Sequence, residues 1–414
     1  MGSGIKFAHL SDIHIGIETH GKINPATGRN TRLEDVLNSL DYIVDEVINK
    51  DVDLVLISGD IFHRENPQPT EETEFARRIN TIVTGSGAEL VIVLGNHDYP
   101  STSHKTAAVE IFPALELPRV RVVKRPEAVT ITTKNGPVQV LCLPWIRKSA
   151  LLTKDEYKSI PSDEIQRELE RRMLSIVRNL IEEADKSIPA VFAGHFSVRN
   201  AVLSGSETTS LDIFEPSISR VELARESLAY VALGHIHRYQ NLNDGSQPPI
   251  VYSGSIERID FSEEREDKGF VMGEIVKKKD GWNCEFQFVK TPARKFFTVE
   301  IDPKAENESI GEAPGPLTPE DIEGAIVRVR YRVSDAEERV DEKKLLETFS
   351  RASSIKIERI FEAPAKTTRG TGLTKNMDAI EALKTYIDSK PELEKVSEKM
   401  IEYARKLAEE TESG

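Results

Sequence analysis

Five short motifs rich in histidine and carboxylate residues follow one another in a fixed order within the first 240 residues. They read Asp12-Ile13-His14, Gly59-Asp60, Gly95-Asn96-His97-Asp98, Gly194-His195 and Gly234-His235-Ile236-His237. Imidazole and oxygen side chains of this kind bind divalent cations. Two cations about 3.5–4 Å apart can activate a hydroxide, neutralise a phosphate and stabilise a leaving oxygen. The motifs therefore indicate a two-metal phosphoesterase site.

Each motif follows a short apolar run, which suggests how the side chains are brought together. The runs are 7–10, 54–57, 90–94, 190–193 and 230–233. Apolar runs followed by Gly or Asp are typical of buried strands that end in tight turns. One such motif arises easily by chance, and a lone histidine after a strand is usually a core residue. Five in order are hard to explain in that way, and we expect them to converge on one edge of a sheet.

The elements that would position these motifs alternate between strands and amphipathic helices over residues 5–276. Apolar residues recur at helical spacing from Leu33 to Val47, and further helices are expected near 71–84 and 163–185. This alternation predicts an α/β fold in which two sheets form a sandwich flanked by helices. The Ser- and Thr-rich stretch 200–223 is expected to be a long surface connection, and such connections are often functional lids.

The pattern changes after residue 276, and we place a second domain at 282–363. Strands are expected at 296–301, 325–332 and 355–361, with a helix near 341–351, so this domain is a small α+β unit without a metal ligand. Residues 364–374 form a Pro-, Gly- and Thr-containing linker. Residues 375–410 carry two apolar stripes at helical spacing, which predict a C-terminal helical hairpin. This helix pair either docks on its own chain or binds a partner.

Composition restricts the classes of protein to which the chain can belong. The net charge of −14 argues against a uniformly basic nucleic-acid binder, although metals and a local basic face could still attract DNA. No segment approaches the roughly 20 apolar residues that cross a bilayer, and no membrane association is expected. The two cysteines, Cys142 and Cys284, lie in strand-like contexts and fit a reducing compartment. We therefore expect a cytoplasmic protein.

Over residues 5–275 the chain resembles the calcineurin-like metallophosphoesterase superfamily. More narrowly, it is similar to the SbcD-type DNA double-strand-break repair nucleases, the prokaryotic homologues of the meiotic-recombination-eleven nuclease. The narrower resemblance rests on Gly59–His63, on Ala232–His237, and on Tyr252–Phe261 with the acidic residues and Lys268-Gly269-Phe270 that follow. The last stretch is more specific than the metal motifs, which many phosphoesterases share.

The resemblance implies two metal ions that share one bridging carboxylate, Asp60. The remaining ligands of the first ion would be Asp12, His14 and His237. The remaining ligands of the second ion would be Asn96, His195 and His235. Mixed nitrogen and oxygen ligands without a thiolate suit manganese, iron or zinc better than calcium. Because members of the family are typically manganese-dependent, two Mn²⁺ ions are expected in preference to iron, zinc or magnesium.

The resemblance also implies three catalytic residues beside the metals. His97 would contact the scissile phosphate or protonate the leaving oxygen, and Asp98 would orient the His97 ring. His63 would help to rotate the phosphate into position for exonuclease cutting. The alternative for His63 is a surface histidine beside Arg64.

The implied function is a DNA nuclease that processes double-strand breaks, with exonuclease activity on duplex ends and endonuclease activity on single strands or hairpins. The α+β unit would be a DNA-binding capping domain, and residues 375–410 would bind an SMC-like coiled-coil ATPase. A homodimer is expected. The alternatives are a cyclic-nucleotide phosphodiesterase, a protein phosphatase and a non-enzymatic scaffold. Gly95-Asn96-His97-Asp98 counts against a phosphatase, since those enzymes carry Glu at the fourth position.

Overall fold

The computed structural model describes residues 4–100, 105–207, 215–279, 281–301, 318–333 and 341–361. It also describes residues 383, 384, 397, 399–401, 403 and 404, which are helical. The predicted linker at 364–374 and most of the predicted helix pair at 375–410 lie outside the described residues. The chain divides into a large unit, made of 1–300, 310–329 and 342–357, and a small unit, made of 301–309, 330–341 and 358–414. Every metal motif belongs to the large unit.

The first sheet of the large unit contains six strands in the order β14-β13-β1-β2-β3-β4. The strands are β1 (Ile5–Leu10), β2 (Leu54–Ser58), β3 (Glu89–Val93), β4 (Val120–Val123), β13 (Gly269–Lys278) and β14 (Gly281–Lys290). Strands β1 to β4 are parallel, and β13 is antiparallel to β1. The carboxyl ends of β1, β2 and β3 therefore lie on one edge of the sheet.

The second sheet contains six strands in the order β11-β12-β10-β7-β6-β5. The strands are β5 (Glu127–Thr133), β6 (Gly136–Leu143), β7 (Ala190–His195), β10 (Leu228–Gly234), β11 (Gln240–Asn241) and β12 (Ile250–Tyr252). Its four central strands, β6, β7, β10 and β12, are parallel. The fourth metal motif is formed by the last two residues of β7, and the fifth begins at the last residue of β10.

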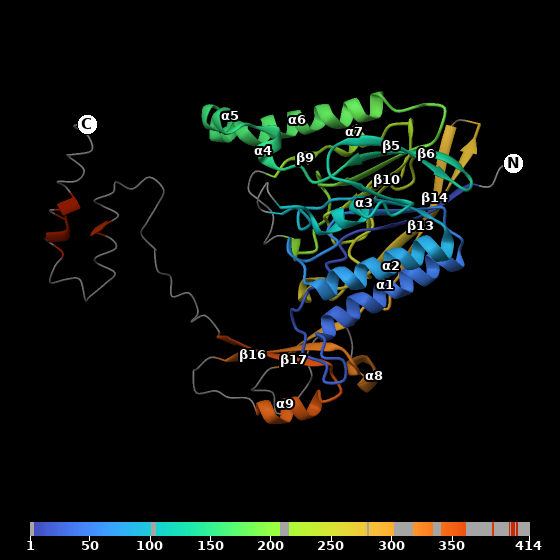
Figure 1. Cartoon of the computed structure of the whole chain (residues 1–414). Helices are drawn as coiled ribbons and strands as arrows, with labels where there is room; N and C mark the ends of the chain where they lie inside the picture. The colour runs from blue at the N-terminus through green and yellow to red at the C-terminus, as the bar shows by residue number, and fades with distance from the viewer. Residues whose placement is uncertain are drawn as a thin grey trace. The chain divides into compact units, whose positions relative to one another are not determined.

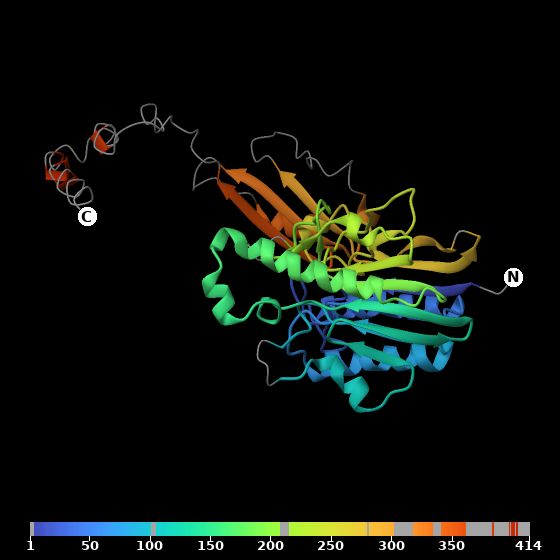
Figure 2. The ribbon, with the colours of Figure 1, turned by 90° about the horizontal axis from the view of Figure 1, so that it is seen from above.

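Three long helices cover the outer faces of the two sheets. They are α1 (Thr31–Asn49), α2 (Pro69–Ser86) and α6 (Ser162–Glu182). Helices α1 and α2 lie side by side on the first sheet, with α6 on the opposite side of the large unit (Figure 1). Figure 2, seen from above, shows α6 lying over the second sheet and running roughly along its strands. The three predicted helices are confirmed, with ends that differ from the expected ones by one to three residues.

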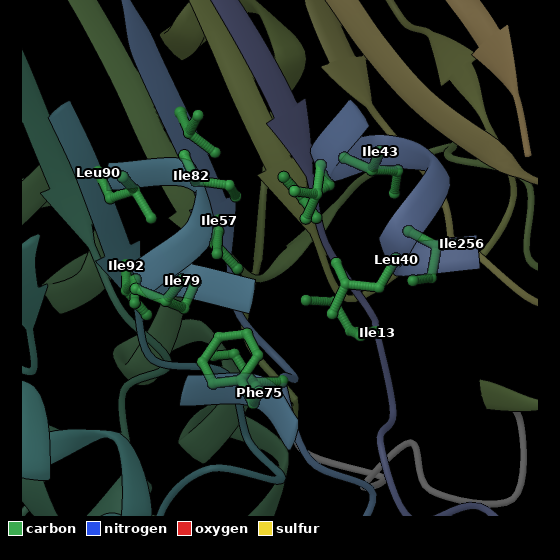
Figure 3. Close-up of a cluster of buried hydrophobic side chains, with 14 of the residues drawn as sticks. Ile13, Leu40, Ile43, Ile57, Phe75, Ile79, Ile82, Leu90, Ile92 and Ile256 are labelled. Atoms are coloured by element: carbon green, nitrogen blue, oxygen red, sulfur yellow. The ribbon is translucent and has the colours of Figure 1, made fainter. Parts of the chain in front are cut away.

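Alternation along the strands separates the core into layers. Ile57 and Ile92 pack with Phe75, Ile79 and other residues of α1 and α2 (Figure 3). The residues that alternate with them along the strands, such as Leu56 and Val91, face the space between the two sheets. Successive strand residues point to opposite faces, so each buried strand must be apolar on both sides. The predicted two-sheet α/β sandwich flanked by helices is confirmed.

Strand β14 corrects the predicted end of the first domain at residue 276. Strands β13 and β14 form a hairpin whose register runs from Gly269 opposite Lys290 to Lys278 opposite Gly281. Cys284, Phe286 and Phe288 alternate along β14 and pack against the core between the sheets. Residues 281–290 therefore belong to the first sheet, and the α+β unit cannot begin at residue 282.

The remaining strands and helices are short or belong to the predicted α+β unit. A three-stranded sheet has the order β15-β16-β17, formed by β15 (Phe296–Ile301), β16 (Ile326–Val333) and β17 (Ser354–Phe361), with α8 (Pro319–Ile322) and α9 (Glu342–Thr348). The short elements are η1 (Ala108–Glu110), α3 (Ile111–Ala114), α4 (Lys148–Leu151), α5 (Lys154–Ser159), β8 (Ser197–Val198), β9 (Ser217–Ile218), α7 (Arg220–Leu223) and η3 (Phe261–Glu263). No helix among the described residues has the length and apolar character needed to cross a membrane.

Candidate metal centre

The strand ends of both sheets bring the predicted site residues to one cavity of about 230 Å³. Five predicted ligands line it, together with both predicted catalytic histidines: His14, Asp60, Asn96, His235, His237, His63 and His97. The remaining two predicted ligands, Asp12 and His195, lie beside Asp60, with their ligating atoms within 4.8 Å of one another. The structure therefore brings all seven predicted ligands together.

Several of these residues adopt a left-handed backbone that is costly for residues other than glycine. The φ angles are 51° at Asp12, 51° at His14, 54° at Asp60 and 100° at His235. Hydrogen bonds between neighbouring turns hold this conformation, as from the Asp12 N–H to the Gly59 carbonyl at 3.0 Å. Such backbone strain persists only where the surroundings enforce it, and it concentrates at functional sites.

Two glycines of the motifs are required by close approach rather than by their φ angles. A Cβ atom at Gly95 would overlap the Asp60 side chain, and one at Gly234 would overlap the Ser58 carbonyl oxygen. Gly95 is therefore needed because the turns after β2 and β3 of the first sheet pack together, and Gly234 because the ends of the two sheets meet there.

The first predicted group of ligands surrounds a common point. The ligating atoms of Asp12, His14 and His237 lie within 4.8 Å of one another, and the two Nε2 atoms of the histidines are 3.1 Å apart. Asp60 Oδ2 lies 3.8 Å from His14 Nε2. Nitrogens and carboxylate oxygens directed at one point are the arrangement expected of ligands to a single cation.

The second predicted group meets on the other side of the same carboxylate. Asn96 Oδ1 lies 2.9 Å from His195 Nε2 and 3.2 Å from His235 Nδ1. Asp60 Oδ2 is 3.5 Å from His195 Nε2, so this carboxylate lies between the two groups. The geometry fits the bridging role of Asp60 and the division of ligands implied by the resemblance, which both remain predictions.

The buried carboxylates Asp12 and Asp60 need positive charge nearby to be stable in ionised form. Burial raises the pKa of Asp12. Burial also opposes ionisation of Asp60, but the charges of His195, His97 and His14 hold its pKa well below the usual range. Burial lowers the pKa of His195, yet Asp60, Asp12 and the Ser58 carbonyl together outweigh that effect and raise it to about 9. Protons on the histidines or divalent cations could balance these buried carboxylates, and the donor set fits the cations.

Asp98 does not have its predicted role. Its carboxylate accepts backbone hydrogen bonds from Asp60 at 2.8 Å, Ile61 at 2.9 Å, Phe62 at 3.3 Å and Gly95 at 2.9 Å. These four donors occupy both oxygens, so Asp98 ties the second motif to the third instead of orienting His97. Burial and the charge of Asp60 raise the pKa of Asp98 to about 7. The four N–H donors favour its carboxylate form.

His97 is oriented by the main chain around His63. Its Nδ1 donates to the His63 carbonyl oxygen at 2.9 Å, and its own N–H donates to Asp60 Oδ1 at 2.9 Å. The His97 and His63 rings are stacked with centroids 5.8 Å apart. Because Nδ1 is engaged, Nε2 is the ring nitrogen left for the cavity that His97 lines.

His63 is half-buried and lines the same cavity. Burial, followed by the charges of His97 and Arg64, lowers the pKa of His63 to about 4. The ring is therefore neutral near pH 7, so it can contact a phosphate through a hydrogen bond but adds no charge. The alternative interpretation, a simple surface histidine, does not fit this position.

Sequence motifs did not identify several residues around the histidine ligands. Glu263 Oε1 lies 3.0 Å from His237 Nδ1, and Glu215 Oε1 lies 2.8 Å from His235 Nε2. The Trp145 ring lies 5.2 Å from the His235 ring between centroids. Glu263 falls just after Phe261, in the acidic stretch that carried the narrower resemblance, and could have been noticed there. Glu215 and Trp145 follow no motif.

Comparisons with known proteins agree with this geometry. A family model described as Calcineurin-like phosphoesterase matches residues 5–239. The DNA double-strand break repair protein Mre11 of Archaeoglobus fulgidus is 26% identical over 371 residues, which cover 86% of this chain and 75% of that protein. The SbcD component of the nuclease SbcCD from Staphylococcus saprophyticus is 25% identical over 66% of this chain and 67% of its own length. The corresponding component from Escherichia coli is 24% identical over 63% of this chain and 62% of its own length.

Proposed function

This chain belongs to the calcineurin-like phosphoesterase family, and from that membership and the geometry of its metal centre we propose that it is a metal-dependent DNA nuclease. The observation that carries the proposal is the position of Asp60 between two groups of ligands at the joined ends of two sheets. The choice of DNA as substrate is supported by the relatives whose names describe a break-repair protein and a component of a nuclease.

The proposed ligands hold two divalent cations, with Mn²⁺ as the preferred metal. When bound, such a pair supplies Lewis-acid neutralisation of the phosphate and an activated water. The chain places its other groups around that centre. Turns at the ends of β1 and β2 fix Asp12 and Asp60, and the Asp98 carboxylate holds the Asp60 turn against Gly95.

His97 is the proposed general acid. Its Nδ1 donates to the His63 carbonyl oxygen, so a proton carried on Nε2 is directed into the cavity. Protonation of the leaving oxygen by such a group contributes about 10²- to 10⁴-fold in rate. His63 is proposed to contact the phosphate as a neutral hydrogen-bonding group. Substitution of His63 by Ala should therefore impair digestion of duplex ends more than cutting of single strands, while equal loss of both activities would contradict this role.

The experiment that tests the function compares substrates on the purified full chain with Mn²⁺. Linear duplex DNA, a DNA hairpin, cyclic AMP and a phosphopeptide are assayed side by side. Cleavage of the two DNA substrates is expected, and a chelator should abolish it. Preference for cyclic AMP or the phosphopeptide would instead favour the alternative phosphodiesterase or phosphatase. Turnover of none of them would overturn the enzymatic proposal.

The domain arrangement and the partners are part of the same proposal. Residues up to β14 form the nuclease domain, and the α+β unit that ends near residue 363 caps it and contacts DNA. Residues 364–374 are the linker, and residues 375–410 bind an SMC-like ATPase. A homodimer and a cytoplasmic location complete the proposal. The names of two relatives describe them as one component of SbcCD, and so as proteins that work in an assembly.

Truncation after residue 370 tests the proposed tether. The truncated protein should keep its metal content and its unfolding temperature, yet it should no longer co-elute with the ATPase in size-exclusion chromatography. Continued co-elution would show that another surface binds the partner. Loss of metal on truncation would place the tail in the nuclease core.

A further inference from the structure

We propose that Glu263 and Glu215 are positioning residues of the metal centre, each holding the ring nitrogen of one histidine that faces away from the cavity. Glu263 holds His237, and Glu215 holds His235. The inference rests on the proposed metal centre and adds to it the residues that set the orientation and tautomer of its last two ligands. Neither glutamate belongs to the proposed ligand set.

Glu263 holds the ring nitrogen of His237 that points away from the other ligands. Its Oε1 lies 3.0 Å from His237 Nδ1, while His237 Nε2 lies 3.1 Å from His14 Nε2. An ionised carboxylate can only accept, so the proton of a neutral His237 must be on Nδ1. The lone pair of Nε2 is then left for a cation. Ser206 Oγ lies 2.9 Å from the same Nδ1 and donates to Glu263, which fixes the carboxylate in turn.

An internal cation allows Glu263 to remain charged without solvent. Lys268 Nζ lies 2.8 Å from Glu263 Oε2, and both side chains are 0% exposed. Lys268 also contacts Glu266 at 3.0 Å and donates to the His237 carbonyl oxygen at 3.1 Å. A buried carboxylate is stable only when it is paired and hydrogen-bonded in this way. The Lys268 ammonium thus supports both the backbone and, through Glu263, the ring of His237.

Glu215 holds the opposite ring nitrogen of the other histidine. Its Oε1 lies 2.8 Å from His235 Nε2, while His235 Nδ1 lies 3.2 Å from Asn96 Oδ1. Ser197 Oγ donates to the same carboxylate oxygen. Glu215 therefore places the proton of His235 on Nε2 and leaves Nδ1 for a cation. Its partners are an imidazole and a hydroxyl, in contrast to the ammonium group beside Glu263.

The two carboxylates thus select opposite tautomers in residues that are only two positions apart. Both histidines follow directly after β10, but without outside partners each ring could present either nitrogen. His195 is held differently, because its Nδ1 donates to the neutral Ser58 carbonyl oxygen at 2.7 Å. A carboxylate also makes the imidazole a stronger base toward metal than a carbonyl does, and loss of such a partner typically weakens metal binding about 10- to 100-fold.

Calorimetric titration of the metal-free full chain with Mn²⁺ tests the inference. Glu263→Gln and Glu215→Gln should each weaken one of two binding steps by about 10- to 100-fold, and they should affect different steps. The matched control is Glu257→Gln, which changes a carboxylate that is 1% exposed and lies beside Arg32, away from the proposed ligands. This control should lower the unfolding temperature and leave both Mn²⁺ steps unchanged.

A second measurement separates positioning from folding. Saturating Mn²⁺ raises the unfolding temperature of a protein that binds it only when folded. This increment should shrink in both test variants and stay at the wild-type value in Glu257→Gln. If Glu263→Gln does not fold because Lys268 loses this buried carboxylate partner, the double variant Glu263→Gln/Lys268→Met is used instead, since it removes both charges.

The outcomes distinguish the inference from the function on which it rests. If the wild type binds two Mn²⁺ ions and both test variants bind them with wild-type affinity, the glutamates do not position the ligands and the inference is overturned. If the wild type binds fewer than two ions, the proposed metal centre itself fails. If Glu257→Gln also weakens an Mn²⁺ binding step, the loss of affinity follows from general loss of stability, and the inference is overturned as well.

Discussion

The two sheets supply the metal centre in different ways. Residues after β1 and β2 lie in tight left-handed turns, and backbone groups hold their carboxylates: Asp60 Oδ1 accepts from the His97 N–H, and Asp12 accepts from the His235 N–H at 3.0 Å. The second sheet supplies imidazoles. Two of these, His235 and His237, are held by carboxylates from distant segments of the chain.

The difference shows that ligand type and means of support are related. A carboxylate can be fixed by N–H groups of its own and neighbouring turns, because these donors are always present in the backbone. An imidazole needs an acceptor for its second nitrogen, and only a carbonyl or an acidic side chain in the right place provides one. The carboxylates of the first sheet are therefore held by main-chain N–H groups of turns that meet at the strand ends, and two imidazoles of the second sheet are held by acidic side chains.

The largest effect is expected when the carboxylate common to both ligand groups is removed. Asp60→Asn keeps a residue that tolerates the left-handed φ of 54° but removes the charge between the two groups. Both metals should be lost and nuclease activity should fall at least about 10³-fold, since metal ions contribute several kcal/mol to such reactions. Nuclease rates and metal analysis measure these effects.

The control for this substitution is Asp51→Asn. Asp51 has the same φ of 54°, but it is exposed and pairs with Lys134. Wild-type metal content and activity are expected. If Asp60→Asn retained two metals, metal binding would not depend on the charge of Asp60, and the first sheet would contribute to it only through its backbone geometry.

The next effect concerns chemistry without metal loss. His97→Leu removes the proposed general acid, whose main-chain N–H remains available to hold Asp60 Oδ1. The rate of DNA cleavage should fall about 10²- to 10⁴-fold while two metals stay bound. Metal analysis beside single-turnover cleavage measures both properties. Loss of an ion would make His97 a ligand and would remove the distinction between it and its neighbour Asn96.

A smaller effect should follow from weakening the link between the second and third motifs. Asp98→Asn replaces one accepting oxygen by a donor that faces backbone N–H groups, which costs about 1–3 kcal/mol of unfolding free energy. Because Asp98 holds the turn of Asp60, Mn²⁺ affinity should fall as well. Urea unfolding and Mn²⁺ titration measure the two changes.

Asp53→Asn provides the comparison for Asp98. Asp53 is buried and accepts from the Lys6 N–H at 2.7 Å and from the Asn135 side chain, near the start of β2. Its substitution should destabilise the fold to a similar extent without changing Mn²⁺ affinity. Equal effects of both substitutions on metal binding would mean that the affinity simply follows global stability.

The effect that is smallest near neutral pH concerns a polar contact that joins the two sheets away from the metals. His9 Nδ1 lies 3.0 Å from the Tyr230 hydroxyl, and burial lowers the pKa of His9 to about 3. Between pH 6.5 and 3 the unfolded imidazole binds a proton that the folded one does not, so stability is lost as pH falls through this range. In His9→Gln the dependence of unfolding free energy on pH should be shallower by up to about 1.4 kcal/mol per pH unit. Identical slopes in urea unfolding would show that His9 is protonated in the fold.

Much of the architecture could be predicted from local patterns. Short apolar runs that end in Gly or Asp mark β1, β2, β3, β7 and β10, because strands buried on both faces must be apolar throughout. Spacing of 3–4 residues marks α1, α2 and α6. Strand β14 was placed in the wrong domain, since its alternating residues Cys284, Phe286 and Phe288 identify a half-buried strand but not the sheet to which it belongs.

The amino-acid sequence by itself determined which residues could bind metal, because ligand chemistry belongs to the side chain and strand ends are set by neighbours in the chain. Only the tertiary structure decided how those residues are held. Asp98 accepts from Asp60 across 38 positions, Glu215 reaches His235 across 20, and Glu263 reaches His237 across 26. Hydrogen bonds act only within about 3 Å and leave no periodic trace in sequence, so such partners emerge when the sheets and connections pack together.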